Sequence, residues 1–346
     1  MKILIVASNM VHINNFHLPY IERFKNDGHS VCIMANGEGA DFNIPFKKKT
    51  LSLSNLRQCF KIRKILKEHS FDAVYLHTSL ASFLVRLSMK GMKKRPRVIS
   101  TVHGYLFGKS TGKLHNLLYL SCERLLKKQT DHIIVMNNED YKIATENRLC
   151  MGEVYLSRGM GVDFKRLDAS YDKDKREKTE LVYVGELSKR KNQIFLVKAM
   201  KELTEYTLTL VGDGDQRDIL QGYIEKNGLS DRVLITGYSD RASEYISRGD
   251  IYVCASRIEG LPFNVMEAMY HKKPIVASRI KGHTDLLPDS CCYKLDSVEE
   301  FVTLVRATPS LPVEYELDGL GLDSVLEKNI SLYYELAEEK SQPIVV

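Results

Sequence analysis

The sequence predicts an α/β fold made of two doubly wound domains, each a parallel sheet covered by helices. The chain has 346 residues, a comfortable length for two domains. Short apolar runs rich in β-branched residues alternate with helical patterns along it, and such runs are typical of strands in a buried parallel sheet. The polar stretch 168–180 is nearly free of apolar residues and divides the alternation in two, as a domain linker would.

Each half of the chain repeats the strand–helix alternation. In the first half we expect strands at residues 2–7, 31–35, 73–77, 98–102 and 132–136, and helices at 17–27, 56–68, 81–89 and 114–128. In the second half we expect strands at 181–184, 206–211, 233–236, 251–255 and 274–278, and helices at 193–203, 216–227, 242–247, 265–270 and 298–306. A last helical pattern covers residues 322–338. The predicted domains are residues 1–166 and 167–321.

Composition excludes several classes of protein. The chain is 44% hydrophobic and 27% charged, so it can build ordinary cores and is not expected to be disordered. Its apolar runs are too short for a signal-peptide core or a transmembrane helix. The seven cysteines are an odd number and contain no Cys-x-x-Cys pair. This favours a reduced, cytoplasmic protein over a disulfide framework or a zinc site.

Charge is distributed unevenly along the chain. Residues 1–165 carry 26 Lys and Arg against 13 Asp and Glu, a net charge of +13, whereas residues 166–346 carry −7. A basic half suits an anionic membrane, a phosphorylated substrate or nucleic acid; solvated charge without a function is the other interpretation. We expect no nucleic-acid partner, because the sequence has neither a recognition motif nor interleaved aromatic and basic residues.

Ligands of doubly wound sheets bind beyond the carboxyl ends of the strands, so the loops that follow strands are the places to search. His103 follows one predicted strand and is either a ligand contact or a turn residue. Gly185 begins the segment Gly-Glu-Leu-Ser-Lys-Arg-Lys-Asn, which places Arg190 and Lys191 at the entry to a helix. Arginine offers a planar fork and lysine a point charge, a combination that suits a diphosphate.

Residues 254–286 carry two glutamates eight positions apart. Glu259 lies in a predicted loop, and Glu267 lies on a helix that opens after a Gly-Leu-Pro turn. Pro262 suits the first helical position, and the N-terminus of a helix can hold an anion. The two carboxylates and the helix start would together suit a sugar, its phosphates and a ribose.

Two glycine-containing loops leave alternatives open. Asp213 and Asp215 could bind a metal, but a tight glycine turn with Asp215 capping the next helix is the simpler interpretation. The same segment half matches the Gly-x-Gly-x-x-Gly fingerprint of NAD-binding proteins, with Arg217 in place of the third glycine. Gly-Tyr-Ser at 237–239 is either a contact for a nucleotide base or a plain turn.

In this order, the motifs resemble those of the retaining GT-B glycosyltransferases of family 4, group 1, and among them bacterial capsule and exopolysaccharide enzymes. The motifs are His103-Gly104, the segment 185–192, Gly-Asp-Gly at 212–214, Glu-x7-Glu at 259–267 and Gly-His-Thr-Asp at 282–285. The resemblance covers nearly the whole chain. It implies the GT-B fold, with two Rossmann-like domains facing a cleft and a C-terminal helix, within residues 322–346, that crosses back to the N-terminal domain.

The resemblance also implies roles for particular residues. Arg190 and Lys191 would grip the nucleotide diphosphate, Glu259 would bind hydroxyls of the donor sugar, and Glu267 would bind those of the ribose. His103 would contact the donor sugar from the other domain. The implied catalytic residues are His103, Glu259, Arg190 and Lys191, and the implied donor-binding residues are Gly185, Arg190, Lys191, Gly237, Tyr238, Glu259, Gly260, Leu261, Pro262 and Glu267. No metal or other cofactor is implied.

By the same resemblance, the reaction is transfer of a hexose from a nucleotide sugar, with UDP as the expected nucleotide, to a glycan hydroxyl with retained configuration. The expected acceptor is a glycan linked to a polyprenyl diphosphate. Basic clusters at 47–49, 61–67 and 90–97 and the Leu-rich stretch 114–128 suit an anionic bilayer, although core packing is the simpler interpretation of those leucines. Our hypothesis is a cytoplasmic protein with peripheral association at the inner face of the plasma membrane.

Two departures from the family pattern bear on donor binding. Glu186 stands where many relatives have arginine, and the loop at 8–15 lacks the glycine-rich turn that many relatives have. Two other functions stay open apart from these departures: a catalytically inactive GT-B-like partner subunit, and an NAD-dependent oxidoreductase with an incomplete fingerprint.

Overall fold

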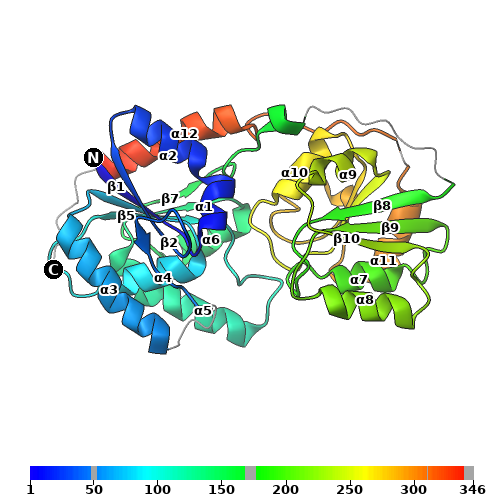
Figure 1. Cartoon of the computed structure of the whole chain (residues 1–346), viewed down its shortest axis with the longest axis horizontal. Helices are drawn as coiled ribbons and strands as arrows, with labels where there is room; N and C mark the ends of the chain where they lie inside the picture. The colour runs from blue at the N-terminus through cyan, green and yellow to red at the C-terminus, as the bar shows by residue number, and fades with distance from the viewer. Residues whose placement is uncertain (48–52, 168–176, 310, 339–346) are drawn as a thin grey trace. The chain divides into compact units, whose positions relative to one another are not determined.

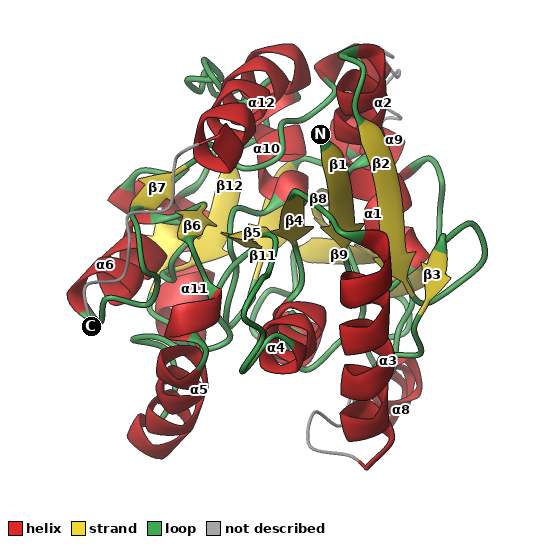
Figure 2. Ribbon diagram, turned by 90° about the vertical axis from the view of Figure 1, so that its left-hand side faces the viewer, coloured by secondary structure: helices red, strands yellow, loops and turns green. Residues whose placement is uncertain are grey.

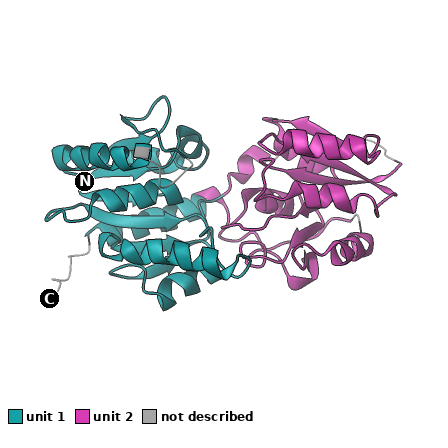
Figure 3. Ribbon diagram, turned by 90° about the horizontal axis from the view of Figure 1, so that it is seen from below, with its two compact units in different colours: residues 1–161, 323–346 teal, residues 162–322 magenta. Residues whose placement is uncertain are grey.

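The computed structural model describes the chain except for residues 48–52, 168–176, 310 and 339–346. It divides into two compact units (Figure 3): unit 1 comprises Met1–Gly161 and Asp323–Val346, and unit 2 comprises Val162–Leu322. The chain therefore enters unit 2 after Gly161 and leaves it at Leu322. Most of the predicted linker, residues 168–176, lies outside the described residues.

Unit 1 is built on a seven-stranded sheet in the order β3-β2-β1-β4-β5-β6-β7, and all of its pairings are parallel. Its central strands are apolar and buried along their length, because helices cover both faces of a parallel sheet. The strands are β1 (Lys2–Val6), β2 (Ser30–Ala35), β3 (Phe42–Asn43), β4 (Ala73–Leu76), β5 (Arg97–Val102), β6 (His132–Val135) and β7 (Val154–Leu156).

Helices cover both faces of this sheet. They are α1 (Met10–Phe16), α2 (Leu18–Asn26), α3 (Leu53–His69), α4 (Ser79–Ser88), α5 (Lys113–Leu125), α6 (Asn138–Glu146), α12 (Leu322–Glu338) and the 3-10 turn η1 (Lys127–Gln129). The helices α3, α4 and α5 lie on one face, and α2 and α12 lie on the other (Figures 1 and 2). Two short elements of unit 1, the helix α6 and the strand β7, were not predicted. Asn137 caps α6, since its side chain accepts from the Asp140 N–H at 2.8 Å.

The C-terminal helix α12 packs on unit 1. The ring of its Tyr333 stacks on that of Tyr75, with centroids 4.5 Å apart, and the hydroxyls of Tyr333 and Thr101 lie 2.6 Å apart. The side-chain amide of Asn329 donates to the Tyr20 hydroxyl and to a backbone carbonyl, both at 2.9 Å. These buried contacts confirm the expected return of the helix to the N-terminal domain.

Unit 2 is built on a six-stranded parallel sheet in the order β10-β9-β8-β11-β12-β13. The strands are β8 (Thr179–Val184), β9 (Tyr206–Val211), β10 (Val233–Gly237), β11 (Ile251–Cys254), β12 (Ile275–Ser278) and β13 (Cys292–Tyr293). The helices are α7 (Gln193–Ala199), α8 (Arg217–Lys226), α9 (Ala242–Arg248), α10 (Phe263–Tyr270) and α11 (Val298–Ala307), with 3-10 turns η2 (Phe164–Leu167) and η3 (Asp289–Cys291). Both units thus have the doubly wound topology that the sequence predicts.

No helix in the described part of the chain is long and apolar enough to cross a bilayer.

Candidate functional site

The loops that follow β8 and β9 are packed tightly at the carboxyl edge of the unit 2 sheet. Gly212 has a φ of +144°, and a Cβ at this position would lie 2.0 Å from the carbonyl oxygen of Gly185. A Cβ at Gly214 would lie 2.2 Å from the carbonyl oxygen of Leu187. These glycines therefore let two loops pack backbone against backbone, which accounts for both glycines of the Gly-Asp-Gly motif.

Asp213 of this motif makes two local contacts, and Asp215 follows the motif. The carboxylate of Asp213 accepts from the Gly214 N–H at 2.8 Å and pairs with Arg217 at 2.9 Å. The prediction that Asp215 caps the following helix is wrong. The N-cap of α8 is Gln216, and no side chain accepts a capping hydrogen bond there, because the helix begins one residue later than the cap at Asp215 would require.

Three of the predicted site residues meet in one ion cluster. The Nζ of Lys191 lies 2.6 Å from one carboxylate oxygen of Glu259, and Nη1 of Arg190 lies 3.0 Å from the other. The same Nη1 donates to the Ile258 carbonyl at 3.2 Å. The backbone N–H of Arg257 donates to the Arg190 carbonyl at 2.9 Å, which ties the two loops together.

The cluster holds Glu259 ionised. The residue is only 6% exposed, and burial alone raises a carboxyl pKa. Lys191 and Arg190 more than offset this effect and lower the pKa of Glu259 to about 2. Lys191 is nearly buried beside Glu259, whereas the Arg190 side chain is 40% exposed. Among the described residues, Nε and Nη2 of Arg190 have no hydrogen-bond partner. One edge of its guanidinium is therefore available to an anion.

A buried layer beneath Glu259 supports the cluster. His283 accepts or donates through Nε2 to the Cys254 thiol at 3.4 Å, and its Nδ1 lies 2.7 Å from the Ser278 carbonyl oxygen. Burial lowers the pKa of His283, but Cys254 and Glu259 reverse the shift and raise it. A Cβ at Gly282 would lie 2.7 Å from the Gly260 carbonyl oxygen, so the Gly-His-Thr-Asp motif packs directly against the glutamate loop.

Glu267 stands apart from the cluster on α10. Its carboxylate has no hydrogen-bond partner among the described residues, and burial raises its pKa to about 7. A half-buried acceptor of this kind is ready to bind the hydroxyls of a ligand. Pro262 proves to be the N-cap of α10 and not its first helical residue, one position from the prediction.

The other predicted residues lie in the loops at the same edge. Leu261 and Pro262 are buried before α10, and Gly237 ends β10 next to the highly exposed ring of Tyr238. All the predicted donor-binding residues thus belong to unit 2. His103 belongs to unit 1, where it follows β5 and contacts His12, His17 and His77.

Sequence reasoning missed a second network beside the cluster. Arg257 makes a bidentate pair with Asp296 at 2.7 and 2.8 Å and also donates to Asn192 at 3.3 Å. This network borders a cavity of about 240 Å³ that Ser188, Lys189, Asn192, Gln193, Ile194, Gln216 and Arg257 line. The sequence does not connect Arg257 with Asp296, because only folding brings the two positions together. The position of Asn192 directly after Lys191 was the one sequence feature that could have indicated this network.

Comparison with known proteins identifies the family. The model described as Glycosyl transferases group 1 matches residues 164–293, and that of Glycosyltransferase Family 4 matches residues 20–148. EpsD of Bacillus subtilis (strain 168), whose name assigns it to the glycosyltransferases, is 31% identical over 309 residues, 83% of this chain and 81% of EpsD. This chain belongs to the group 1, family 4 glycosyltransferases.

Two further similarities are to a named enzyme and to a solved structure. An Escherichia coli enzyme named UDP-Gal:α-D-GlcNAc-diphosphoundecaprenol α-1,3-galactosyltransferase is 27% identical over 77% of this chain and 74% of its own length. The solved structure of Anabaena HepE in complex with UDP and glucose has a TM-score of 0.71 at 15% identity, and covers 97% of this chain and all of that one. The expected family, enzyme class and fold are confirmed, and the oxidoreductase alternative is set aside.

Proposed function

We propose that this glycosyltransferase moves a hexose from a UDP-sugar to a hydroxyl of a lipid-linked glycan, with retained anomeric configuration and without a metal. The observation that carries the proposal is the cluster of Arg190, Lys191 and Glu259 at the carboxyl edge of the unit 2 sheet. It offers one guanidinium edge that no described residue contacts, and one lysine beside a carboxylate that stays ionised. Such a cluster suits a dianionic leaving group, and its carboxylate can also orient a polar sugar.

The donor would be held by its two ends. The diphosphate would pair with Arg190 and with the backbone N–H groups after Gly260, before α10. The ribose hydroxyls would donate to the carboxylate of Glu267, which has no partner within the described residues. The base would lie at Gly237 and Tyr238, whose ring is exposed and offers a stacking surface. UDP is the nucleotide we propose, since HepE was solved with UDP and the E. coli relative is named for a UDP-sugar.

In the proposed reaction, the bond between the anomeric carbon and the donor phosphate oxygen breaks, and the acceptor oxygen bonds to that carbon on the same face. The acceptor proton passes to the leaving phosphate oxygen. Arg190 and Lys191 stabilise the negative charge that develops on the diphosphate, which is the largest contribution a site of this kind makes. Glu259 orients the two cations and the sugar hydroxyls, and His103 contacts the donor sugar.

A membrane-bound acceptor is supported by the surface of unit 1. No residue of α5 is buried, and Leu114, Leu117, Leu118 and Leu125, on one stripe of the helix, are each more than half exposed. The interpretation of these leucines as core is therefore wrong. Phe60 of α3 is 76% exposed among lysines, and α3 and α5 lie on the same face of the sheet (Figure 2). Exposed apolar side chains with basic neighbours suit an anionic bilayer.

A thermal-shift panel of nucleotides and nucleotide sugars tests the donor. A ligand at a hundred times its dissociation constant stabilises the folded state by about 2.7 kcal/mol, so the correct donor should raise the melting midpoint. Arg190→Ala should abolish the shift, whereas Lys226→Ala, at the far end of α8, should preserve it. If no nucleotide or nucleotide sugar moves the midpoint, the proposed donor site is wrong.

The partner-subunit alternative makes a different prediction. It predicts that Glu259→Gln leaves polysaccharide synthesis in the cell intact, whereas the proposed enzyme loses it.

Flotation with vesicles tests the membrane surface. Wild-type protein should float with vesicles that contain phosphatidylglycerol at low salt, and the double change Leu117→Ser and Leu118→Ser should reduce flotation strongly. Ile219→Ser, at an exposed apolar position on α8 in unit 2, is the matched control and should float as the wild type does. Absence of binding to anionic vesicles at low salt would rule out the membrane proposal.

A further inference from the structure

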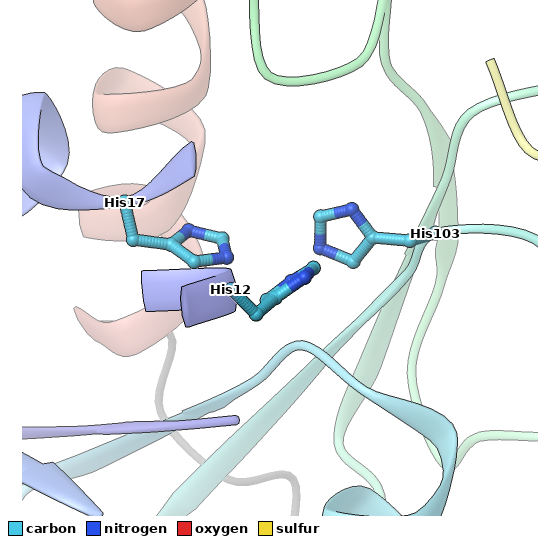
Figure 4. A group of neighbouring side chains, drawn as sticks. All are labelled: His12, His17 and His103. Atoms are coloured by element: carbon cyan, nitrogen blue, oxygen red, sulfur yellow. The ribbon is translucent and has the colours of Figure 1, made fainter. Parts of the chain in front are cut away.

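Four histidines from three segments of unit 1 gather at the carboxyl edge of its sheet. His12 lies on α1, His17 separates α1 from α2, and His77 and His103 directly follow β4 and β5. The ring centroid of His12 lies 5.0 Å from that of His17 and 5.0 Å from that of His103. Figure 4 shows the rings of His12, His17 and His103 turned toward a common centre.

Local structure explains why His12 and His17 meet. On one continuous helix, positions five apart point in different directions. Here Asn9 caps α1 by accepting from the His12 N–H at 2.8 Å, and the helix ends at His17, where α2 begins with Pro19 in its first turn. The break between the two helices turns the His17 ring back toward His12.

Two nitrogens of this cluster lack partners in the described part of the chain. The Nε2 atoms of His12 and His17 are buried and have no hydrogen-bond partner among the described residues, and His17 is only 1% exposed. Buried polar atoms of this kind are costly to leave unsatisfied. His103 Nε2 has a contact, with Nδ1 of His77 at 3.3 Å. Two unsatisfied imidazole nitrogens that face the same point indicate a missing ligand.

We propose that His12, His17 and His103 form a binding site for a divalent transition metal of the Zn²⁺ class. Each of the three offers one ligand nitrogen, and these atoms all lie within 4.8 Å of one another. Bonds of about 2.0–2.1 Å in a tetrahedral site separate ligand nitrogens by about 3.4 Å, so the rings need to approach by at most about 1.4 Å. Three imidazoles and one open position are an established donor set for zinc.

The donor atoms indicate the class of metal. Imidazole nitrogens favour zinc, nickel or copper over magnesium or calcium, which take oxygen ligands.

The site has an entrance and a supporting residue. A cavity of about 190 Å³, lined in part by His12, His77 and His103, adjoins the cluster, and it has room for the ion and a water molecule. The ring of His77 lies against that of His17, with centroids 3.9 Å apart. His77 thus contacts two of the three ligands and is placed to fix their ring orientation, as groups around metal ligands do.

Metal in this site would oppose sugar transfer. The proposed reaction uses no metal and needs His103 to contact the donor sugar, whereas a bound ion would engage the same imidazole. We therefore expect Zn²⁺ to inhibit transfer and a chelator to restore it. This consequence rests on the proposed function, but metal binding does not.

Metal titration of the full chain tests the site. Protein without a histidine tag, stripped with a chelator, should bind one equivalent of Co²⁺ with the visible absorption of a tetrahedral complex, and Zn²⁺ should displace it. Mg²⁺ should give no signal. His12→Ala and His17→Ala should each weaken Zn²⁺ binding by at least about 100-fold, and His115→Ala, on the exposed helix α5, should bind as the wild type does.

A more conservative substitution is needed in case an alanine variant unfolds unit 1. His12→Gln keeps the volume and polarity of the side chain, and circular dichroism with a melting curve shows whether it is folded. A folded His12→Gln protein that binds Zn²⁺ with wild-type affinity would overturn the proposal, as would a wild-type chain that binds no Zn²⁺.

The two proposals fail separately. A chain that binds a UDP-sugar but no Zn²⁺ refutes only the metal site, and one that binds Zn²⁺ but no nucleotide sugar refutes only the proposed function.

Discussion

Replacing Glu259 with glutamine tests whether Arg190 and Lys191 keep the buried carboxyl of Glu259 ionised. The pKa of this carboxyl is about 2 in the folded chain, against an ordinary value of 4.5. At 1.36 kcal/mol per unit, ionised Glu259 contributes about 3 kcal/mol to the stability of unit 2 at pH 7. Glu259→Gln should lose this contribution, and it should leave Lys191 nearly buried without its counter-ion.

The sign of the pH dependence follows from the lowered pKa. Stability from Glu259 is fully present above pH 4.5 and is lost as the pH falls toward 2. The difference between wild type and Glu259→Gln should therefore shrink from about 3 kcal/mol at pH 7 to about 2 kcal/mol at pH 3.5. Urea unfolding, followed by circular dichroism at both pH values, measures this difference.

An exposed pair provides the control. Glu314 pairs with Lys272 at 2.6 Å, but both side chains are more than half exposed, so Glu314→Gln should change stability little at either pH. If Glu259→Gln were as stable as the wild type at pH 7, or if the difference were the same at pH 3.5, the argument that the two cations hold Glu259 ionised would be refuted.

Three further predictions test other parts of the structure. Gly212→Ala should destabilise unit 2 by about 3 kcal/mol or more, because its Cβ would lie 2.0 Å from a carbonyl oxygen. Gly222→Ala, in open space on α8, should stabilise unit 2 by about 1 kcal/mol. Equal melting points of the two variants would contradict this prediction. Wild-type protein should lose stability as the pH rises from 4.5 through 7, where half-buried Glu267 ionises. Glu267→Gln should show no such loss, so the two proteins should unfold alike at pH 4 and differ at pH 8. Tyr333→Phe should cost about 1 kcal/mol by removing the buried contact with Thr101, and an unchanged urea midpoint would show that α12 does not depend on it.

Strongly periodic elements were predictable because local pattern and tertiary environment agree in them. The strand Tyr206–Val211 and the helix Leu322–Glu338 have the predicted bounds. The stretch 114–128 was misread because its leucines repeat at helical spacing, a pattern that a core helix and a helix exposed on the surface share. Only the packing of the rest of unit 1 shows that the stripe with Leu114, Leu117, Leu118 and Leu125 stays exposed, whereas Tyr119 and Leu120 of the same helix pack against the core.

The sequence by itself determined the two doubly wound sheets, the family, and the loops in which Arg190, Lys191 and Glu259 stand. These features depend on periodicity and on motifs, which are local in the chain. The tertiary structure decided what those residues do to one another. The low pKa of Glu259 comes from two cations nearly seventy positions away, and the histidine cluster comes from α1 and the ends of two strands. Distances between remote side chains, and the burial that strengthens their interactions, exist only once the chain has folded.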